Sequence, residues 1–224
     1  MGANRARARE LAKKHLAAGD AVGWFERLYT SAAGDPRAIS WADMCPNPNL
    51  LAWLAGPHAG QLGKRALVVG CGLGDDAEEL ARRGQQVTAF DVAATAVDWC
   101  RRRFPQSAVA YVVADLLQPP EAWHGAFDFV FEAYTLQVLP PTVRKQAMQN
   151  LAVCVAPDGT LLVIARGREP HEPEGDMPWP LMRAELSTLE LAGLTCESFE
   201  DYLDAENPPV RRFRATFRRE SKDL

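Results

Sequence analysis

The chain has 224 residues, 29 acidic and 25 basic side chains and a formal net charge of −4. This length suits one α/β domain with a buried core, and the charge gives no electrostatic reason to expect nucleic acid or an anionic membrane as a partner. There is no apolar run of the ~20 residues that cross a bilayer, no secretory signal and no metal-ligand spacing among the five scattered cysteines, so we expect a cytoplasmic protein with reduced thiols and no metal site.

The chain begins with segments that have helical patterns. Residues 5–18 are basic, and residues 21–30 place aromatic and apolar side chains at helical spacing. A third helix is predicted at about 48–55, with Asn47 as its N-cap and Pro48 in its first turn. Three helices are therefore expected before the first strand.

The rest of the chain alternates strands with helices. Strands are predicted at residues 66–69, 86–90, 109–113, 127–133, 160–166, 194–201 and 211–219. Helices are predicted at residues 75–83, 94–103, 142–155 and 180–192. This alternation is typical of a parallel sheet with helices on both faces, and the near-continuous apolar runs of the strands indicate that both faces are covered. The predicted fold class is α/β.

A glycine-rich turn follows the first of these strands. Gly70, Gly72 and Gly74 alternate with other residues in VVGCGLGDD, and a helical pattern begins directly afterwards. Glycine lets the main chain turn sharply and lets a ligand lie against it. The next apolar run, VTAFD, ends at Asp91, whose carboxylate can accept hydrogen bonds from both hydroxyls of a ribose. Together these features predict a nucleoside pocket.

The spacing of the glycines bears on which nucleoside binds. The dinucleotide fingerprint has its third glycine three positions after the second, where this chain has Asp75. Asp75 and Asp76 would repel a pyrophosphate at the start of the helix, whereas a ligand with a sulfonium centre and an amino-acid tail would not be repelled. Because Asp91 would also suit the ribose of NAD, a nicotinamide-dependent oxidoreductase remains an alternative.

Five motifs follow one another between residues 64 and 166. They are VVGCGLGDD (68–76), the acid Asp91, VVADLL (112–117), FDFVFEAYTLQVL (127–139) and LAVCVAPDGTLLVI (151–164). In this order they resemble the motifs of class I S-adenosylmethionine-dependent methyltransferases. The resemblance implies S-adenosylmethionine as cofactor and a Rossmann-like sheet of seven mostly parallel strands, with helices on both faces and the last strand antiparallel.

The resemblance also implies a set of cofactor-binding residues. They are Gly70, Cys71, Gly72, Gly74, Asp91, Val92, Asp115, Leu116 and Glu132. The glycine turn would hold the methionine end of the cofactor, and Asp91 would bind the ribose. Asp115 would accept a hydrogen bond from the adenine amino group, between walls formed by Val92 and Leu116. Glu132 would face the space into which the methyl group points.

A narrower resemblance concerns the methyl acceptor. Residues 127–144 and a W…DP…W block before the glycine motif look similar to the thiopurine and thiol methyltransferase branch, which covers cofactor and substrate with an N-terminal extension. We therefore expect residues 1–60 to form a helical lid and residues 61–224 to form the methyltransferase domain. The expected acceptor-binding residues are Trp24, Trp41, Tyr134, Arg166, His171 and Trp179.

The predicted reaction is methyl transfer to a small-molecule acceptor by in-line displacement. None of the four histidines lies in a recognisable motif, and no catalytic residue is assigned. A thiol, which ionises near neutral pH, needs little help from a base, so a thiol or a similar soft nucleophile is favoured.

Two further alternatives stay open. A protein that binds S-adenosylmethionine without catalysis would show the same cofactor motifs. A methyltransferase of nucleic acid or protein is disfavoured by the acidic balance and by the tetrapeptide EAYT at 132–135, which lacks the amide and paired prolines that grip a flipped-out amino group. The sequence makes no prediction of the oligomeric state.

Overall fold

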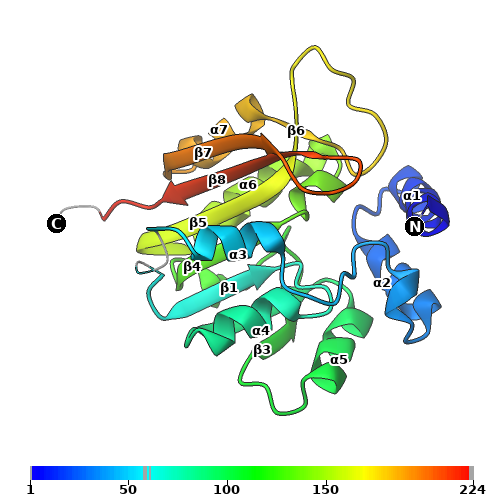
Figure 1. Ribbon diagram of the computed structural model, residues 1–224, viewed down its shortest axis with the longest axis horizontal. Helices are drawn as coiled ribbons and strands as arrows, with labels where there is room; N and C mark the ends of the chain where they lie inside the picture. The colour runs from blue at the N-terminus through cyan, green and yellow to red at the C-terminus, as the bar shows by residue number, and fades with distance from the viewer. Residues whose placement is uncertain (1, 58–59, 61, 222–224) are drawn as a thin grey trace.

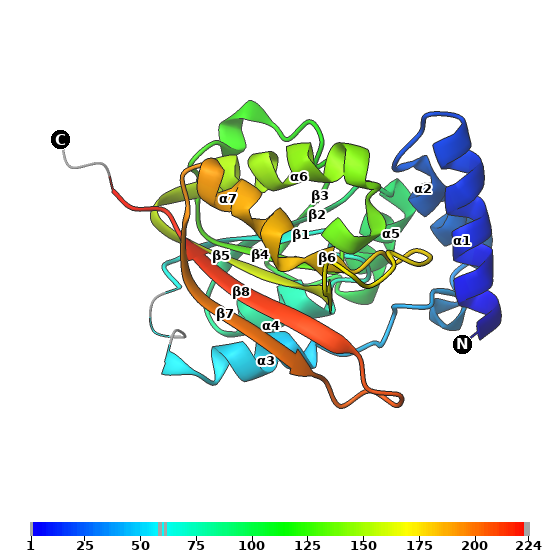
Figure 2. The same cartoon turned by 90° about the horizontal axis from the view of Figure 1, so that it is seen from above.

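The structure is a computed structural model that describes residues 2–57, 60 and 62–221, so residue 61 at the predicted domain boundary lies outside the described part. One sheet, covered by helices on both faces, forms its centre (Figures 1 and 2). The strands are β1 (Arg65–Val69), β2 (Gln86–Asp91), β3 (Ala110–Val113), β4 (Phe127–Ala133), β5 (Val155–Arg168), β6 (Leu181–Met182), β7 (Thr195–Leu203) and β8 (Arg211–Arg218). The helices are α1 (Gly2–Ala17), α2 (Gly23–Ala32), α3 (Pro48–Leu54), α4 (Asp75–Arg82), α5 (Ala94–Arg103), α6 (Pro141–Cys154) and α7 (Ser187–Leu191), with 3-10 turns η1 (Pro36–Ala38), η3 (Glu121–Trp123), η4 (Leu136–Val138) and η5 (Arg183–Leu186).

The strand order is β3–β2–β1–β4–β5–β8–β7, and β1 to β5 are parallel to one another. β8 lies antiparallel between β5 and β7. This topology confirms the predicted α/β, Rossmann-like fold and its antiparallel last strand. The two-residue β6 is an addition to the seven predicted strands, paired with the end of β5. The carboxyl ends of the parallel strands meet at one edge, which is where open α/β sheets bind ligands.

The side chains of β1 explain why both faces of the sheet are covered. They point alternately to opposite faces, as the period of two requires. Leu67 and Val69 belong to a core that α6 and α7 share, whereas Ala66 and Val68 belong to a second core with α3, α4 and α5. Figure 2 shows α6 and α7 on one side of the sheet and α3 and α4 on the other.

The helix α3 belongs to the core of the domain, although it lies within the first sixty residues. The Trp53 ring stacks on Phe129 with 5.3 Å between ring centroids, and its Nε1 donates a hydrogen bond to Thr216 Oγ1 at 3.0 Å. Since Phe129 is on β4 and Thr216 on β8, α3 is fixed to the middle of the sheet.

The first two helices lie beyond the carboxyl ends of the parallel strands (Figure 1). They form a third apolar cluster with α5. Glu26 on α2 strengthens this contact, because its Oε2 accepts a hydrogen bond from the Thr95 main-chain N–H at 3.0 Å, in the first turn of α5. A negative charge is favourable at the N-terminus of a helix. Helices α1 and α2 therefore lie beside the carboxyl ends of the parallel strands, packed on α5.

The predicted helix at 180–192 is only partly correct, because the segment forms β6, η5 and the short α7. Pro180 disfavours helical backbone at the residue before it, and Leu181 pairs with Gly167 of β5. Glu185 Oε2 then accepts a hydrogen bond from the Met182 N–H at 2.8 Å, which starts the η5 turn. Strand β5 is also longer at both ends than predicted. Within the described residues, no helix has both the length and the apolar character that a bilayer span requires.

Candidate functional site

The loop between β1 and α4 is built on three glycines in the left-handed region. Gly70, Gly72 and Gly74 have φ values of 57°, 55° and 91°, which side chains rarely allow. A Cβ atom on Gly70 would lie 2.3 Å from Thr135 Oγ1, and one on Gly74 would lie 2.6 Å from the Tyr111 hydroxyl. Backbone conformation and close neighbours therefore both require glycine at positions 70 and 74, and the loop exposes bare main chain.

Asp91, the last residue of β2, is held against this loop. Its Oδ2 accepts a hydrogen bond from the Gly72 N–H at 3.1 Å, and its Oδ1 accepts one from the Ala93 N–H at 2.9 Å. The residue is only 7% exposed, and burial raises its pKa to about 6 despite these two hydrogen bonds. The carboxylate is thus fixed in position before any ligand arrives.

The two acids at the start of α4 differ in their surroundings. Asp75 forms two hydrogen bonds of 2.8 Å with the guanidinium of Arg103, which offsets its charge. Asp76 accepts a hydrogen bond from the Asn47 N–H at 2.7 Å, and burial raises its pKa to about 6. Asp76 is therefore the acid whose charge would repel a phosphate near the loop. The sequence alone had suggested that Asp75 and Asp76 would both do so.

A cavity of about 1120 Å³ lies at the carboxyl ends of β1, β2, β4 and β5, with α1 and α2 contributing to its walls. The predicted site residues that line it are Gly70, Cys71, Gly72, Asp91, Val92, Asp115, Leu116, Trp41, Tyr134 and Arg166. Those that do not line it are Gly74, Glu132, Trp24, His171 and Trp179. The cavity brings most of the predicted cofactor-binding residues together with some of the predicted acceptor-binding residues.

Residues 66–159 match a family model described as a methyltransferase domain. The Ubiquinone biosynthesis O-methyltransferase of Pectobacterium carotovorum subsp. carotovorum (strain PC1) is 33% identical over 115 residues, which are 50% of this chain and 47% of that protein. The chain spans half or less of the length of the curated relatives that it matches.

Among the solved structures with a similar fold are two methyltransferases. N-methyltransferase NodS from Bradyrhizobium japonicum WM9, in complex with S-adenosyl-L-homocysteine, has a TM-score of 0.64 and 21% identity, covering 77% of this chain and 85% of that chain. The 1,6-didemethyltoxoflavin-N1-methyltransferase of Burkholderia thailandensis has a TM-score of 0.67 and 19% identity, covering 88% of both chains. At these identities the likeness is evidence for the fold. With the family match, it supports the predicted class I methyltransferase domain.

Glu132 lies beneath the cavity rather than in its wall. The residue is fully buried, and its Oε1 accepts hydrogen bonds from the N–H groups of Thr135 at 2.7 Å and Leu136 at 2.9 Å. Burial raises the pKa of Glu132 to about 7. The side chain therefore supports the turn after β4, which in turn places Thr135 against Gly70.

The aromatic residues of the N-terminal segment divide between core and cavity. Trp24 is fully buried and stacks on Phe25, with 3.8 Å between ring centroids. Trp41 lines the cavity, and its Nε1 donates a hydrogen bond to the Tyr29 hydroxyl at 3.0 Å. Tyr29 also lines the cavity, with its hydroxyl 3.4 Å from the Cβ position of Gly72. Sequence reasoning missed Tyr29, although its helical spacing from Trp24 and Phe25 was the available signal.

The long segment after β5 reaches the cavity through residues other than the predicted ones. His171 is exposed and Trp179 is half-buried against the cluster of α1, α2 and α5. Met177 and Pro178 line the cavity instead. Arg9 of α1 donates a hydrogen bond through Nε to the Met177 carbonyl at 2.5 Å. This segment and the first helix therefore meet over the site.

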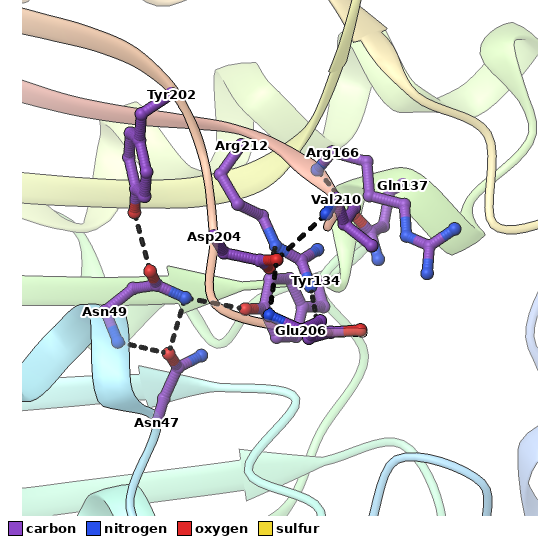
Figure 3. A network of polar contacts seen from close by, with 10 residues as sticks. All are labelled: Asn47, Asn49, Tyr134, Gln137, Arg166, Tyr202, Asp204, Glu206, Val210 and Arg212. Atoms are coloured by element: carbon purple, nitrogen blue, oxygen red, sulfur yellow. Dashed lines mark hydrogen bonds and ion pairs between the residues drawn. The ribbon is translucent and has the colours of Figure 1, made fainter. Parts of the chain in front are cut away.

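A polar network surrounds Tyr134 at the end of β4 (Figure 3). Its hydroxyl accepts a hydrogen bond from Asn49 Nδ2 at 3.0 Å, and Tyr202 donates one to Asn49 Oδ1 at 2.6 Å. Tyr134 has a φ of 68°, an unfavourable value for a bulky side chain that persists where the surroundings enforce it. The network therefore holds the tyrosine ring in the wall of the cavity, and Asn49 and Tyr202 had no signal in the sequence.

Proposed function

We propose that this protein is an S-adenosylmethionine-dependent methyltransferase with a small-molecule acceptor, and that thiols and similar soft nucleophiles are favoured. The observation that carries the proposal is the fixed carboxylate of Asp91 beside the glycine loop, at the wall of a large cavity. The match of residues 66–159 to a methyltransferase domain supports it.

Asp91 fits the ribose of the cofactor. A carboxylate offers about four acceptor sites on its two oxygens, and Asp91 uses one on each oxygen for the N–H groups of Gly72 and Ala93. Each carboxylate oxygen therefore keeps one free acceptor site, and the two sites together can bind the two ribose hydroxyls. The two hydrogen bonds from main-chain N–H groups also favour the ionised form of the Asp91 carboxyl group, which is the form that accepts hydrogen bonds on both oxygens.

The other parts of the cofactor have matching groups along the cavity. Asp115 is oriented by the Leu117 N–H, which donates to its Oδ1 at 2.8 Å. Its carboxylate would accept a hydrogen bond from the adenine amino group, between Val92 and Leu116. The Tyr29 hydroxyl accepts from Trp41, so its own proton remains available to donate to the carboxylate of the methionine end. The glycine loop supplies main-chain groups beside it.

When bound beside Asp91 and the glycine loop, S-adenosylmethionine would supply a methyl group activated by its sulfonium sulfur. The chain's contribution is to align the two reactants and to exclude water. Helices α1 and α2 and Met177 of the segment after β5 cover the cavity.

The composition of the cavity wall favours an acceptor that ionises by itself. No histidine or lysine among the described residues lines it, so among the common general bases only carboxylates, tyrosines and cysteines are present in the wall. A thiol reaches its nucleophilic form near neutral pH without a base, whereas a hydroxyl needs one.

Two measurements test the proposal. Titration calorimetry with S-adenosylhomocysteine should give saturable one-to-one binding, and NADH should not compete. Absence of binding to folded protein, or tight binding of a nicotinamide nucleotide in its place, would refute it. A panel of thiols, phenols and amines should then show turnover that is fastest for thiols, and binding without turnover on any acceptor would instead identify a non-catalytic binding protein.

A further inference from the structure

Two arginines lie directly opposite one another in the sheet. Arg166 of β5 pairs in register with Arg212 of the antiparallel β8, and both line the cavity. Residues opposite one another in adjacent strands point to the same face, and like charges in such a pair are destabilising. The arrangement therefore costs stability unless both charges are compensated.

Arg212 is compensated by its neighbours (Figure 3). Its Nε forms an ion pair of 2.6 Å with Asp204, and its terminal nitrogen forms another with Glu206. The guanidinium carbon also lies 4.5 Å from the centre of the Tyr134 ring, a cation–π contact. Arg212 is only 2% exposed, and the two nearby carboxylates are engaged with it.

Arg166 has no such compensation. Its main-chain N–H donates to Gln137 Oε1 at 2.7 Å, but within the described chain no residue forms a hydrogen bond or ion pair with its guanidinium, whose buried Nε is unpartnered. Figure 3 shows the guanidinium extending away from the Arg212 network. Burial, with the positive charges of Arg212 and Arg5, lowers the pKa of Arg166. Arg166 as a whole is half-buried. Because partial loss of hydration disfavours a cation that has no partner, a bound anion would relieve this cost.

The position of Arg166 assigns that anion to the acceptor rather than to the cofactor. Adjacent strands lie about 4.8 Å apart, so β5 is roughly 14 Å from β2, which carries Asp91, with β1 and β4 between them. Arg5 of α1 lines the same cavity, so the first helix adds a second cation. Three acids line this end of the cavity as well, but Asp204 and Glu206 are paired with Arg212, and Asp43 lies near Arg5 and Arg212. The guanidinium of Arg166, at the end remote from the predicted ribose site, is therefore the group there that a bound anion would partner.

We propose that the methyl acceptor carries a carboxylate, and that the Arg166 guanidinium binds this group while Arg5 adds positive charge from α1. The proposal rests on the methyltransferase function proposed above. The planar guanidinium matches a carboxylate with two parallel hydrogen bonds. Binding the carboxylate at β5 would direct the other end of the acceptor toward Tyr134 and the cofactor site.

Calorimetry of the protein with S-adenosylhomocysteine bound, using benzoate and its neutral isostere benzamide, tests this proposal without requiring turnover. Benzoate should bind roughly tenfold or more tightly than benzamide, which is the scale of a charged hydrogen bond. The substitution Arg166→Gln should lower the affinity for benzoate to that for benzamide. Equal affinities in the wild-type protein, binding of neither probe, or unchanged benzoate binding by the variant would each overturn the proposal.

Turnover supplies a second readout with 4-mercaptobenzoate and 4-mercaptobenzamide. Arg166→Gln should raise KM for the acid and leave the amide unaffected, and Arg166→Lys should recover part of the loss. Equal effects on both thiols would overturn the proposal.

Control variants separate charge recognition from folding. Arg7→Gln removes a charge from an exposed position of α1 outside the cavity, and benzoate affinity should be unchanged, whereas Arg5→Gln should weaken it. Because Arg166→Gln removes a like-charge pair, its Tm should stay equal or rise, and a large fall would indicate a structural role and contradict the proposal. Failure of the proposed function is distinguishable: S-adenosylhomocysteine would then not bind, while benzoate would still bind the free protein through Arg166.

Discussion

Asp91 joins two parts of the site through its two oxygens. One oxygen holds the glycine loop at Gly72, and the other holds the turn into α5 at Ala93. The same carboxylate is the proposed ribose ligand. At the scale of single residues, ligand binding and loop geometry thus depend on one side chain.

The substitution Asp91→Ala should weaken binding of S-adenosylhomocysteine by about 1.5–3 kcal/mol, the scale of hydrogen bonds to a charged group. Calorimetry measures this difference. The variant Asp98→Ala removes an acid from an exposed position of the neighbouring α5 and should leave affinity unchanged. Equal affinities for wild type and Asp91→Ala would show that the ribose lies elsewhere.

The glycine at position 74 provides a second test at this scale. Gly74 and Gly84 both have a φ of 91°, but a Cβ atom would meet Tyr111 only at position 74, and at position 84 it would meet nothing within 4 Å. Gly84→Ala should cost about 1–2 kcal/mol for the left-handed backbone alone. Gly74→Ala should cost about 1–3 kcal/mol more, the usual effect of overpacking. Urea denaturation compares the two, and equal losses would show that the contact with Tyr111 is unimportant.

At the scale of elements, the contact between α2 and α5 decides where the N-terminal helices lie. Glu26 accepts hydrogen bonds from both the main chain and the hydroxyl of Thr95. Burial alone would raise the pKa of Glu26, but these hydrogen bonds outweigh it and lower the pKa. The interaction is a helix cap supplied by a neighbouring helix, and it fixes α2 beside the cavity.

Replacing Glu26 by alanine should therefore loosen α2 from α5. We expect a loss of about 1 kcal/mol in the free energy of unfolding, as for other helix caps, and faster proteolysis before residue 45. Limited proteolysis followed by mass spectrometry measures the second effect. Glu10→Ala removes an exposed acid that pairs with Lys14 within α1 and serves as the control. Identical cleavage rates in the two variants would contradict the role given to Glu26.

At the scale of the whole molecule, three buried acids shape the dependence of stability on pH. Burial raises the pKa of Asp76 and Asp91 to about 6 and that of Glu132 to about 7. These values lie above those of an unfolded chain, about 4, so between about pH 4 and 7 the folded protein binds more protons than the unfolded one. The contribution of these groups to stability therefore falls as the pH rises through this window.

We expect the ligand-free protein to unfold at a higher temperature near pH 5 than near pH 7.5. Asp128, whose pKa hydrogen bonding to Arg65 lowers to about 2, opposes this trend only below about pH 4. Thermal denaturation at several pH values measures the slope. Glu132→Gln keeps an oxygen that accepts from Thr135 and Leu136 but cannot ionise, so it should flatten the slope. A slope that is the same in wild type and variant would contradict this account.

The order of the elements could be predicted because its determinants are local. Continuous apolar runs mark the parallel strands, and the glycine turn requires residues that are close in sequence. The prediction of one helix over residues 180–192 was only partly correct. Leu181 pairs with Gly167 of β5, and no local sequence pattern signals that contact. Trp24 and Trp41 were both predicted to bind the acceptor, and only the tertiary packing placed Trp24 of α2 in the core and Trp41, which follows η1, at the cavity.

The sequence by itself determined the class of fold, the glycine turn and the acid beside it, since hydrophobic periodicity and backbone freedom belong to short stretches of chain. The tertiary structure alone decided which charges are compensated. Arg166 and Arg212 come from strands far apart in the chain and face one another only through the antiparallel register of β5 and β8. Because ion pairing depends on distances between such distant segments, the unpaired arginine in the cavity could be recognised only once the sheet was assembled.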